Sequence, residues 1–138
     1  MRILILCTGN SCRSQMAEGI LRSLDPSLEI HSAGTRPEKH VNPNAIKVMK
    51  EIGLDISRQH PKQVGLFTGD SFDFVITVCG NANENCPVFT GKVGKRIHLG
   101  FEDPAAAKGS GEEVLSVYRT VRDQIRKGFL DFYRDLKI

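Results

Sequence analysis

A cysteine, five further residues and an arginine form the pattern in this sequence that most clearly points to chemistry. Cys7 and Arg13 frame the pattern, and the hydroxyl residue Ser14 follows. A loop of five residues can curl so that its backbone N–H groups point at one tetrahedral oxyanion, and an arginine can bind two oxygens of that anion. The predicted anion-binding residues are Thr8, Gly9, Asn10, Ser11, Cys12, Arg13 and Ser14. We call residues 7–14 the oxyanion loop.

The positive electrostatic field of these N–H groups and the arginine makes Cys7 the candidate nucleophile. Inward N–H groups, the N-terminal end of a following helix and Arg13 are expected to lower the pKa of the Cys7 thiol, so that its thiolate is populated at neutral pH. Ser14 is expected to donate a hydrogen bond to that thiolate. The alternative is a small buried cysteine at a strand end beside an unrelated surface arginine.

The elements around the loop favour the anion-binding interpretation. Residues 2–6 are a short apolar run, typical of a buried strand, and a helical stripe runs from Met16 to Leu24. Gly9 and Asn10 tolerate the positive φ angles that a tight loop needs. A strand, a glycine-containing loop and a helix therefore stand in the order that an anion-binding loop requires.

The rest of the chain alternates in the same way. Further strands are predicted over residues 28–31, 72–78 and 96–99, and further helices over residues 42–53 and 110–136. Alternation of this kind predicts an α/β fold, a three-layer sandwich in which helices flank a four-stranded parallel sheet. Residues 1–138 are expected to form a single catalytic domain. Cys7 and Cys79 each follow an apolar strand, so a parallel sheet would place both sulfurs at one edge.

Length, charge and composition exclude several classes of protein. The 138 residues carry a net charge of +3 with 25% charged residues, which is ordinary for a globular protein and gives no sign of nucleic-acid binding. Four cysteines are too few for a disulfide scaffold. The first apolar run is too short for a signal peptide or a membrane span. We therefore expect a cytoplasmic protein with reduced thiols.

Residues 7–18, Cys-Thr-Gly-Asn-Ser-Cys-Arg-Ser-Gln-Met-Ala-Glu, resemble the catalytic loop of the low-molecular-weight protein tyrosine phosphatase fold. The Thr-Gly-Asn-Ser filling and the added cysteines are similar to the thioredoxin-coupled arsenate reductase branch. Shorter similar stretches lie at residues 32–34, 41–43, 78–79, 85–87, 100–105 and 119–123. The resemblance implies a monomer without a cofactor that converts arsenate to arsenite and is reduced by thioredoxin.

Asp103 is the candidate general acid. A thiolate that attacks an oxyanion needs its leaving oxygen protonated, and Pro104 restricts the backbone that aims this carboxyl group. Spacing alone leaves an ordinary turn aspartate open, whereas the resemblance implies that this Asp-Pro holds the acid. Ala105 follows where the phosphatases usually carry an aromatic residue. This difference favours a small inorganic oxyanion over a phosphotyrosine side chain.

Cys79 and Cys86 enclose six residues with little apolar content, a segment that can rearrange at low cost. A buried Cys79 with an incidental Cys86 remains open, and the cysteine spacing argues against zinc. The resemblance implies a relay in which Cys7 attacks arsenate, Cys79 attacks Cys7 and Cys86 attacks Cys79. Thioredoxin would then reduce the Cys79–Cys86 disulfide.

Two other functions share much of this site. A low-molecular-weight phosphatase acting on phosphoesters would use Cys7, Arg13 and Asp103 alone. A thiol redox sensor or oxyanion-binding module would produce no arsenite. Cys12 could form an off-pathway disulfide with Cys7 under oxidation.

No metal site is expected. Some relatives bind potassium through an asparagine, a glutamate and a serine, which correspond here to Asn10, Glu18 and Ser32. We predict that Lys62 lies near Glu18 and replaces the cation.

Overall fold

The fold is built on a parallel sheet of four strands in the order β2-β1-β3-β4. The computed structural model describes residues 1–80 and 87–136. The strands are β1 (Arg2–Cys7), β2 (Glu29–Gly34), β3 (Phe72–Thr77) and β4 (Val93–His98). All three strand pairs are parallel, which confirms the predicted sheet. Every residue from Ile3 to Cys7 is buried, as expected for a central strand covered on both faces.

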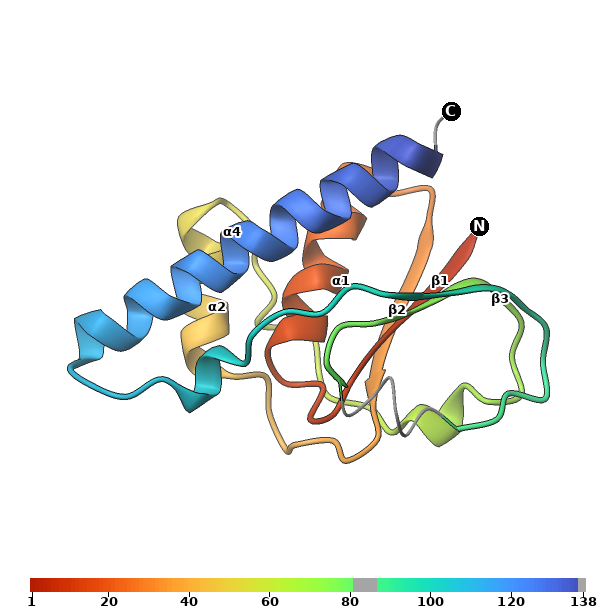
Figure 1. Ribbon diagram of the computed structural model, residues 1–138, viewed down its shortest axis with the longest axis horizontal. Helices are drawn as coiled ribbons and strands as arrows, with labels where there is room; N and C mark the ends of the chain where they lie inside the picture. The colour runs from red at the N-terminus through yellow and green to blue at the C-terminus, as the bar shows by residue number, and fades with distance from the viewer. Residues whose placement is uncertain (81–86, 137–138) are drawn as a thin grey trace.

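Three helices lie within the described residues. They are α1 (Arg13–Leu24), α2 (Pro43–Glu51) and α4 (Gly111–Leu136), with short 3-10 turns η1 (Val64–Leu66) and η2 (Pro104–Ala106). Asn42 caps α2 by accepting the backbone N–H of Asn44 at 2.8 Å. Figure 1 shows α4 lying across α1, with α2 beside them.

The predicted edge strand differs most from the observed one. The sequence predicts residues 96–99, whereas β4 covers Val93–His98. Four of its six residues are exposed, so the hydrophobic pattern that reveals a buried strand is missing. Similarly, β2 extends to Gly34, beyond the predicted residues 28–31.

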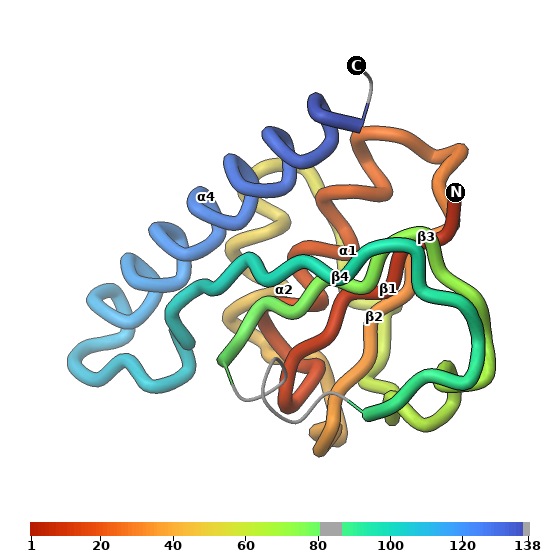
Figure 2. Tube along the Cα trace, turned by 45° about the vertical axis from the view of Figure 1, so that its right-hand side comes forward, coloured from red at the N-terminus to blue at the C-terminus, as the bar shows by residue number. Residues whose placement is uncertain are grey.

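The carboxyl ends of β1 and β3 meet at one edge of the sheet, which confirms the predicted position of the two cysteines. Leu6 pairs with Thr77, and the N–H of Val78 donates to the Leu6 carbonyl at 2.9 Å. Cys7 directly follows Leu6, and Cys79 directly follows Val78. Figures 1 and 2 show this edge at the bottom of both views, where β1 turns into the loop before α1.

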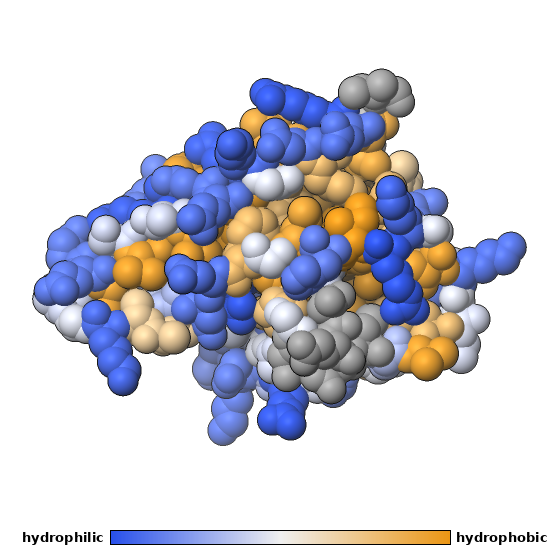
Figure 3. Space-filling view, in the orientation of Figure 1, coloured by the Kyte–Doolittle hydropathy of each residue, from blue (hydrophilic) through white to orange (hydrophobic). Residues whose placement is uncertain are grey.

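The long helix α4 is amphipathic, as its spacing predicts. Its buried residues include Tyr118, Ile125 and Phe129, and the ring of Phe132 meets Phe74 of β3 edge-on at 5.2 Å between centroids. Figure 3 shows hydrophilic side chains along its outer face. Within the described ranges, no helix has the length and apolar character that a membrane crossing needs.

Candidate active site

Every carbonyl of the oxyanion loop from Cys7 to Cys12 is held by a donor outside the loop centre. Backbone N–H groups of 35, 36, 38 and 42 donate to the carbonyls of 7, 8, 9 and 11 at 2.8–3.2 Å. The side chain of Gln15 donates to the Asn10 carbonyl at 2.9 Å, and the N–H of Met16 donates to Cys12. In a planar trans peptide the N–H points opposite to the carbonyl. The loop amides therefore point away from these donors, and their convergence on one oxyanion stays a prediction.

Two residues make this tight curl possible. Asn10 has a φ of 48°, the left-handed conformation that asparagine tolerates better than most residues. Its side chain is fully buried, donates to Ser14 Oγ at 2.7 Å and accepts from the Lys62 N–H at 2.9 Å. At Gly34, a Cβ would lie 2.4 Å from the Thr8 carbonyl oxygen, so only glycine lets β2 approach the loop. The expected donation from Ser14 to Cys7 stays a prediction.

Arg13 is the candidate arginine for binding an anion above the loop. Its Nη1 donates to the Phe101 carbonyl at 3.0 Å, and its Nη2 lies 3.7 Å from Asp103 Oδ2. Its Nε is buried and has no hydrogen-bond partner within the part of the chain that the structure describes. A buried donor without an acceptor costs free energy, so this N–H is ready for an anion oxygen.

Asp103 comes from the loop after β4 and lies at the same edge. Its Oδ1 accepts the Ala105 N–H at 3.0 Å, which caps the short turn η2 and fixes the carboxyl group. Its other oxygen faces Arg13. Asp103 and Arg13, 90 positions apart in the sequence, therefore line one hollow with Cys7.

Cys7 and Cys79 are both buried here, Cys79 Sγ lies 3.2 Å from Thr8 Oγ1, and the influence of Cys79 on Cys7 overturns one expectation. The Cys79 hydrogen bond raises the pKa of the Cys7 thiol, and burial raises it further. Arg13 and the Thr8 N–H do lower the pKa, as the sequence predicts, but their effect is smaller. The prediction of a lowered pKa is therefore wrong for this arrangement, because it did not include a second thiol in contact with the first.

Cys12 is buried in the same loop, and its thiol pKa is also raised, with burial as the main cause. Burial raises the pKa of its thiol to about 12, Asp103 adds to the increase and Arg13 opposes it. Its thiol therefore stays protonated at neutral pH. Cys86 lies outside the described residues.

The hollow above the loop has a volume of about 760 Å³ and a lining of mixed polar and apolar atoms. Beside the loop, its walls include Arg36, Lys39 and His40 from the segment after β2, together with Asp103 and Ala105. None of its described lining residues is phenylalanine or tyrosine. The described walls thus offer charge for a small anion and no phenylalanine or tyrosine ring for a phenyl group.

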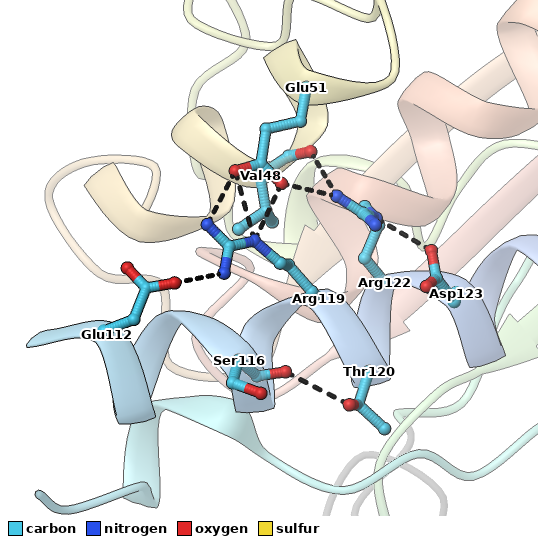
Figure 4. A network of polar contacts seen from close by, with 8 residues as sticks. All are labelled: Val48, Glu51, Glu112, Ser116, Arg119, Thr120, Arg122 and Asp123. Atoms are coloured by element: carbon cyan, nitrogen blue, oxygen red, sulfur yellow. Dashed lines mark hydrogen bonds and ion pairs between the residues drawn. The ribbon is translucent and has the colours of Figure 1, made fainter.

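Helix α4 supports the loop through α2. The Asn42 side chain donates to the Tyr118 hydroxyl at 3.0 Å, and the Asn42 N–H holds the Ser11 carbonyl. Farther along, Arg119 and Arg122 of α4 both bind Glu51 of α2, as Figure 4 shows. The sequence identifies Asn42 as a helix cap. Its second role, linking the loop to α4, depends on the contact with Tyr118, 76 positions away.

The predicted proximity of Lys62 and Glu18 is confirmed, although Glu18 has other direct partners. Glu18 accepts from Ser32 Oγ at 2.6 Å and pairs with Arg22 at 3.0 Å. Lys62 Nζ donates to the His60 carbonyl at 2.7 Å. Burial lowers the pKa of Lys62, while the charge of Glu18 raises it. Among the described residues, no group of three or more His, Cys, Asp or Glu side chains could hold a metal ion.

Comparisons with known proteins agree with this geometry. A family model described as low molecular weight phosphotyrosine protein phosphatase matches residues 2–137. An arsenate reductase of Halalkalibacterium halodurans is 48% identical over 132 residues, covering 94% of this chain and 93% of that protein. An arsenate reductase of Bacillus subtilis is 46% identical over 132 residues with the same coverage. A solved structure described as an arsenate reductase in the phosphate binding state has a TM-score of 0.82 at 32% identity, covering 97% of each chain.

Proposed function

Since this chain belongs to the low-molecular-weight phosphotyrosine protein phosphatase family, we propose that it uses the family's anion-binding loop to reduce arsenate to arsenite. The observation that carries this proposal is a second buried thiol at the loop, because Cys79 Sγ lies 3.2 Å from Oγ1 of Thr8, the residue directly after Cys7. Hydrolysis of a phosphoester needs one nucleophilic sulfur, whereas reduction needs a second sulfur that can attack the first. The relatives named arsenate reductase support the same assignment.

The first step joins Cys7 to arsenic. Inward amides and the Arg13 guanidinium hold the arsenate dianion, whose basic oxygen takes the proton of Cys7. The resulting thiolate forms an S–As bond, and one hydroxyl of arsenate leaves as water with a proton from Asp103. Substrate thus supplies the base that the Cys7–Cys79 pair lacks. The buried Arg13 Nε gains its acceptor in this complex.

The second step transfers two electrons to arsenic. The Cys79 sulfur attacks Cys7 as a thiolate, the S–As bond breaks and its electron pair stays on arsenic, which leaves as arsenite. A Cys7–Cys79 disulfide results. Cys86 then attacks Cys79 and releases the Cys7 thiolate, and a dithiol reductant of the thioredoxin class returns the Cys79–Cys86 disulfide to thiols. We propose that the protein acts as a monomer in the cytoplasm.

Phosphoester hydrolysis is the second candidate, because Cys7, Arg13 and Asp103 suffice for it. The described lining of the hollow carries no phenylalanine or tyrosine, so it offers the phenyl ring of an aryl phosphate no such ring to pack against. We therefore expect only slow hydrolysis, and this residual activity gives a useful internal control.

Cysteine-to-serine variants separate the two functions. Arsenate-dependent NADPH oxidation is measured with thioredoxin and thioredoxin reductase, and p-nitrophenyl phosphate hydrolysis is measured in parallel. Cys79→Ser and Cys86→Ser should each abolish multiple turnover of arsenate and keep the phosphatase rate. Undiminished arsenate turnover in either variant would refute the relay. A wild-type protein that hydrolyses the ester but forms no arsenite would identify it as a phosphatase.

A further inference from the structure

The carboxamide of Gln15 is a fully buried polar group beneath the oxyanion loop. Gln15 is the third residue of α1, and its Nε2 donates to the Asn10 carbonyl at 2.9 Å and to the His60 carbonyl at 3.1 Å. It therefore joins the loop to the segment before η1. Among the described residues, the Asn10 carbonyl has no other donor, whereas the His60 carbonyl also accepts from Lys62 Nζ.

Gln59 decides which way the Gln15 carboxamide faces. Gln59 Nε2 donates to Gln15 Oε1 at 2.7 Å and to the Gln15 carbonyl at 3.0 Å. Because Oε1 is occupied by this donor, the amino group of Gln15 must face the Asn10 and His60 carbonyls. The two glutamines thus act together, and only the orientation seen here satisfies every polar atom of the Gln15 side chain.

This orientation fixes one backbone amide of the oxyanion loop. The Asn10 carbonyl and the Ser11 N–H belong to the same planar peptide, so they point in opposite directions. Asn10 is already in the left-handed conformation, where a rotation of the next peptide would turn the Ser11 N–H away from the centre. Of the loop carbonyls from Cys7 to Cys12, Asn10 alone is held by a side chain rather than by a backbone N–H.

We infer that Gln15, oriented by Gln59, is a positioning residue that keeps the Ser11 N–H directed at the bound oxyanion. The inference rests on the proposed function only in that the loop binds a tetrahedral oxyanion. Removal of the Gln15 amino group leaves a buried Asn10 carbonyl without its donor, which favours rotation of the Asn10–Ser11 peptide.

The test compares Gln15→Met, Gln59→Met and the control Ile125→Val. Ile125 is buried in α4, seven positions after Tyr118, whose hydroxyl makes the contact that supports the loop, so its variant reports the effect of lost stability. Binding of inorganic phosphate to each reduced protein is measured by calorimetry, thermal unfolding is recorded, and KM and kcat for arsenate are determined separately.

We expect phosphate to bind about tenfold more weakly to Gln15→Met, because one charged hydrogen bond is lost. Gln59→Met keeps the Gln15 donors but frees their orientation, so its loss should be smaller, and Ile125→Val should bind like wild type. The loss should fall on KM more than on kcat.

Wild-type affinity in Gln15→Met, or a loss no larger than that of Ile125→Val, would overturn the inference. If Gln15→Met does not fold, the same criterion applies to Gln59→Met. Failure of the proposed function is distinguishable, because it would appear as missing arsenite production by a wild-type protein that still binds phosphate.

Discussion

Replacement of Arg13 by lysine tests the central feature of the site while keeping its charge. Arg13 uses Nη1 on the Phe101 carbonyl, places Nη2 3.7 Å from Asp103 and leaves its buried Nε without a described partner. A guanidinium can hold Phe101 and an anion at once, because its donors form a rigid fork. A lysine ammonium has no such fork. It must give up either the anchor or at least one hydrogen bond to the oxyanion.

The expected loss of kcat/KM follows from the number of hydrogen bonds that lysine gives up. One hydrogen bond to a charged group contributes about 1.5–3 kcal/mol, so kcat/KM for arsenate should fall about 10- to 150-fold in Arg13→Lys. Affinity for inorganic phosphate should fall in parallel. Arg119→Lys is the matched control, because Arg119 binds Glu51 and Glu112 away from the hollow (Figure 4). Its exposed ion pairs contribute little, so both measurements should stay within twofold of wild type.

The reasoning would be refuted if Arg13→Lys kept kcat/KM and phosphate affinity within threefold of wild type. That result would mean that charge alone binds the anion and that the fork is not used. Equal losses in Arg13→Lys and Arg119→Lys would also refute it, because they would indicate a general effect on folding.

Three further outcomes follow from the geometry. Asp103→Asn keeps the oxygen that caps η2 but cannot supply a proton, so kcat should fall about 10²- to 10⁴-fold with an unchanged melting temperature. A stable, fully active variant would exclude Asp103 as the acid. Cys79→Ser removes the main influence that raises the pKa of Cys7. The pH midpoint of Cys7 alkylation by iodoacetamide should therefore move to lower pH. An unchanged or higher midpoint would contradict this prediction. Arsenate turnover should be equal in potassium chloride and sodium chloride, because the Lys62 side chain near Glu18 is predicted to replace a bound potassium ion. A rise in turnover that is specific to potassium would contradict this prediction.

The sequence was most informative where chemistry depends on local spacing. Cys7, a five-residue loop and Arg13 are close in the chain, and a strand before them and a helix after them leave few ways to arrange the loop. The same holds for the Asn42 cap, whose hydrogen bonds reach only two and three residues ahead. By contrast, the sequence predicts the start of β4 three residues too late, because an exposed edge strand carries little hydrophobic pattern.

The sequence by itself determined which residues are the candidates for reaction: a cysteine nucleophile, an arginine fork, an aspartic acid and a second cysteine after a parallel strand. Tertiary structure alone decided how these groups influence one another. The contact with Cys79, 72 positions from Cys7, reverses the expected direction of the pKa shift. Gln15 gains its role only because Gln59 packs against it. Electrostatic and hydrogen-bond effects depend on distance through space, and no spacing along the chain contains that distance.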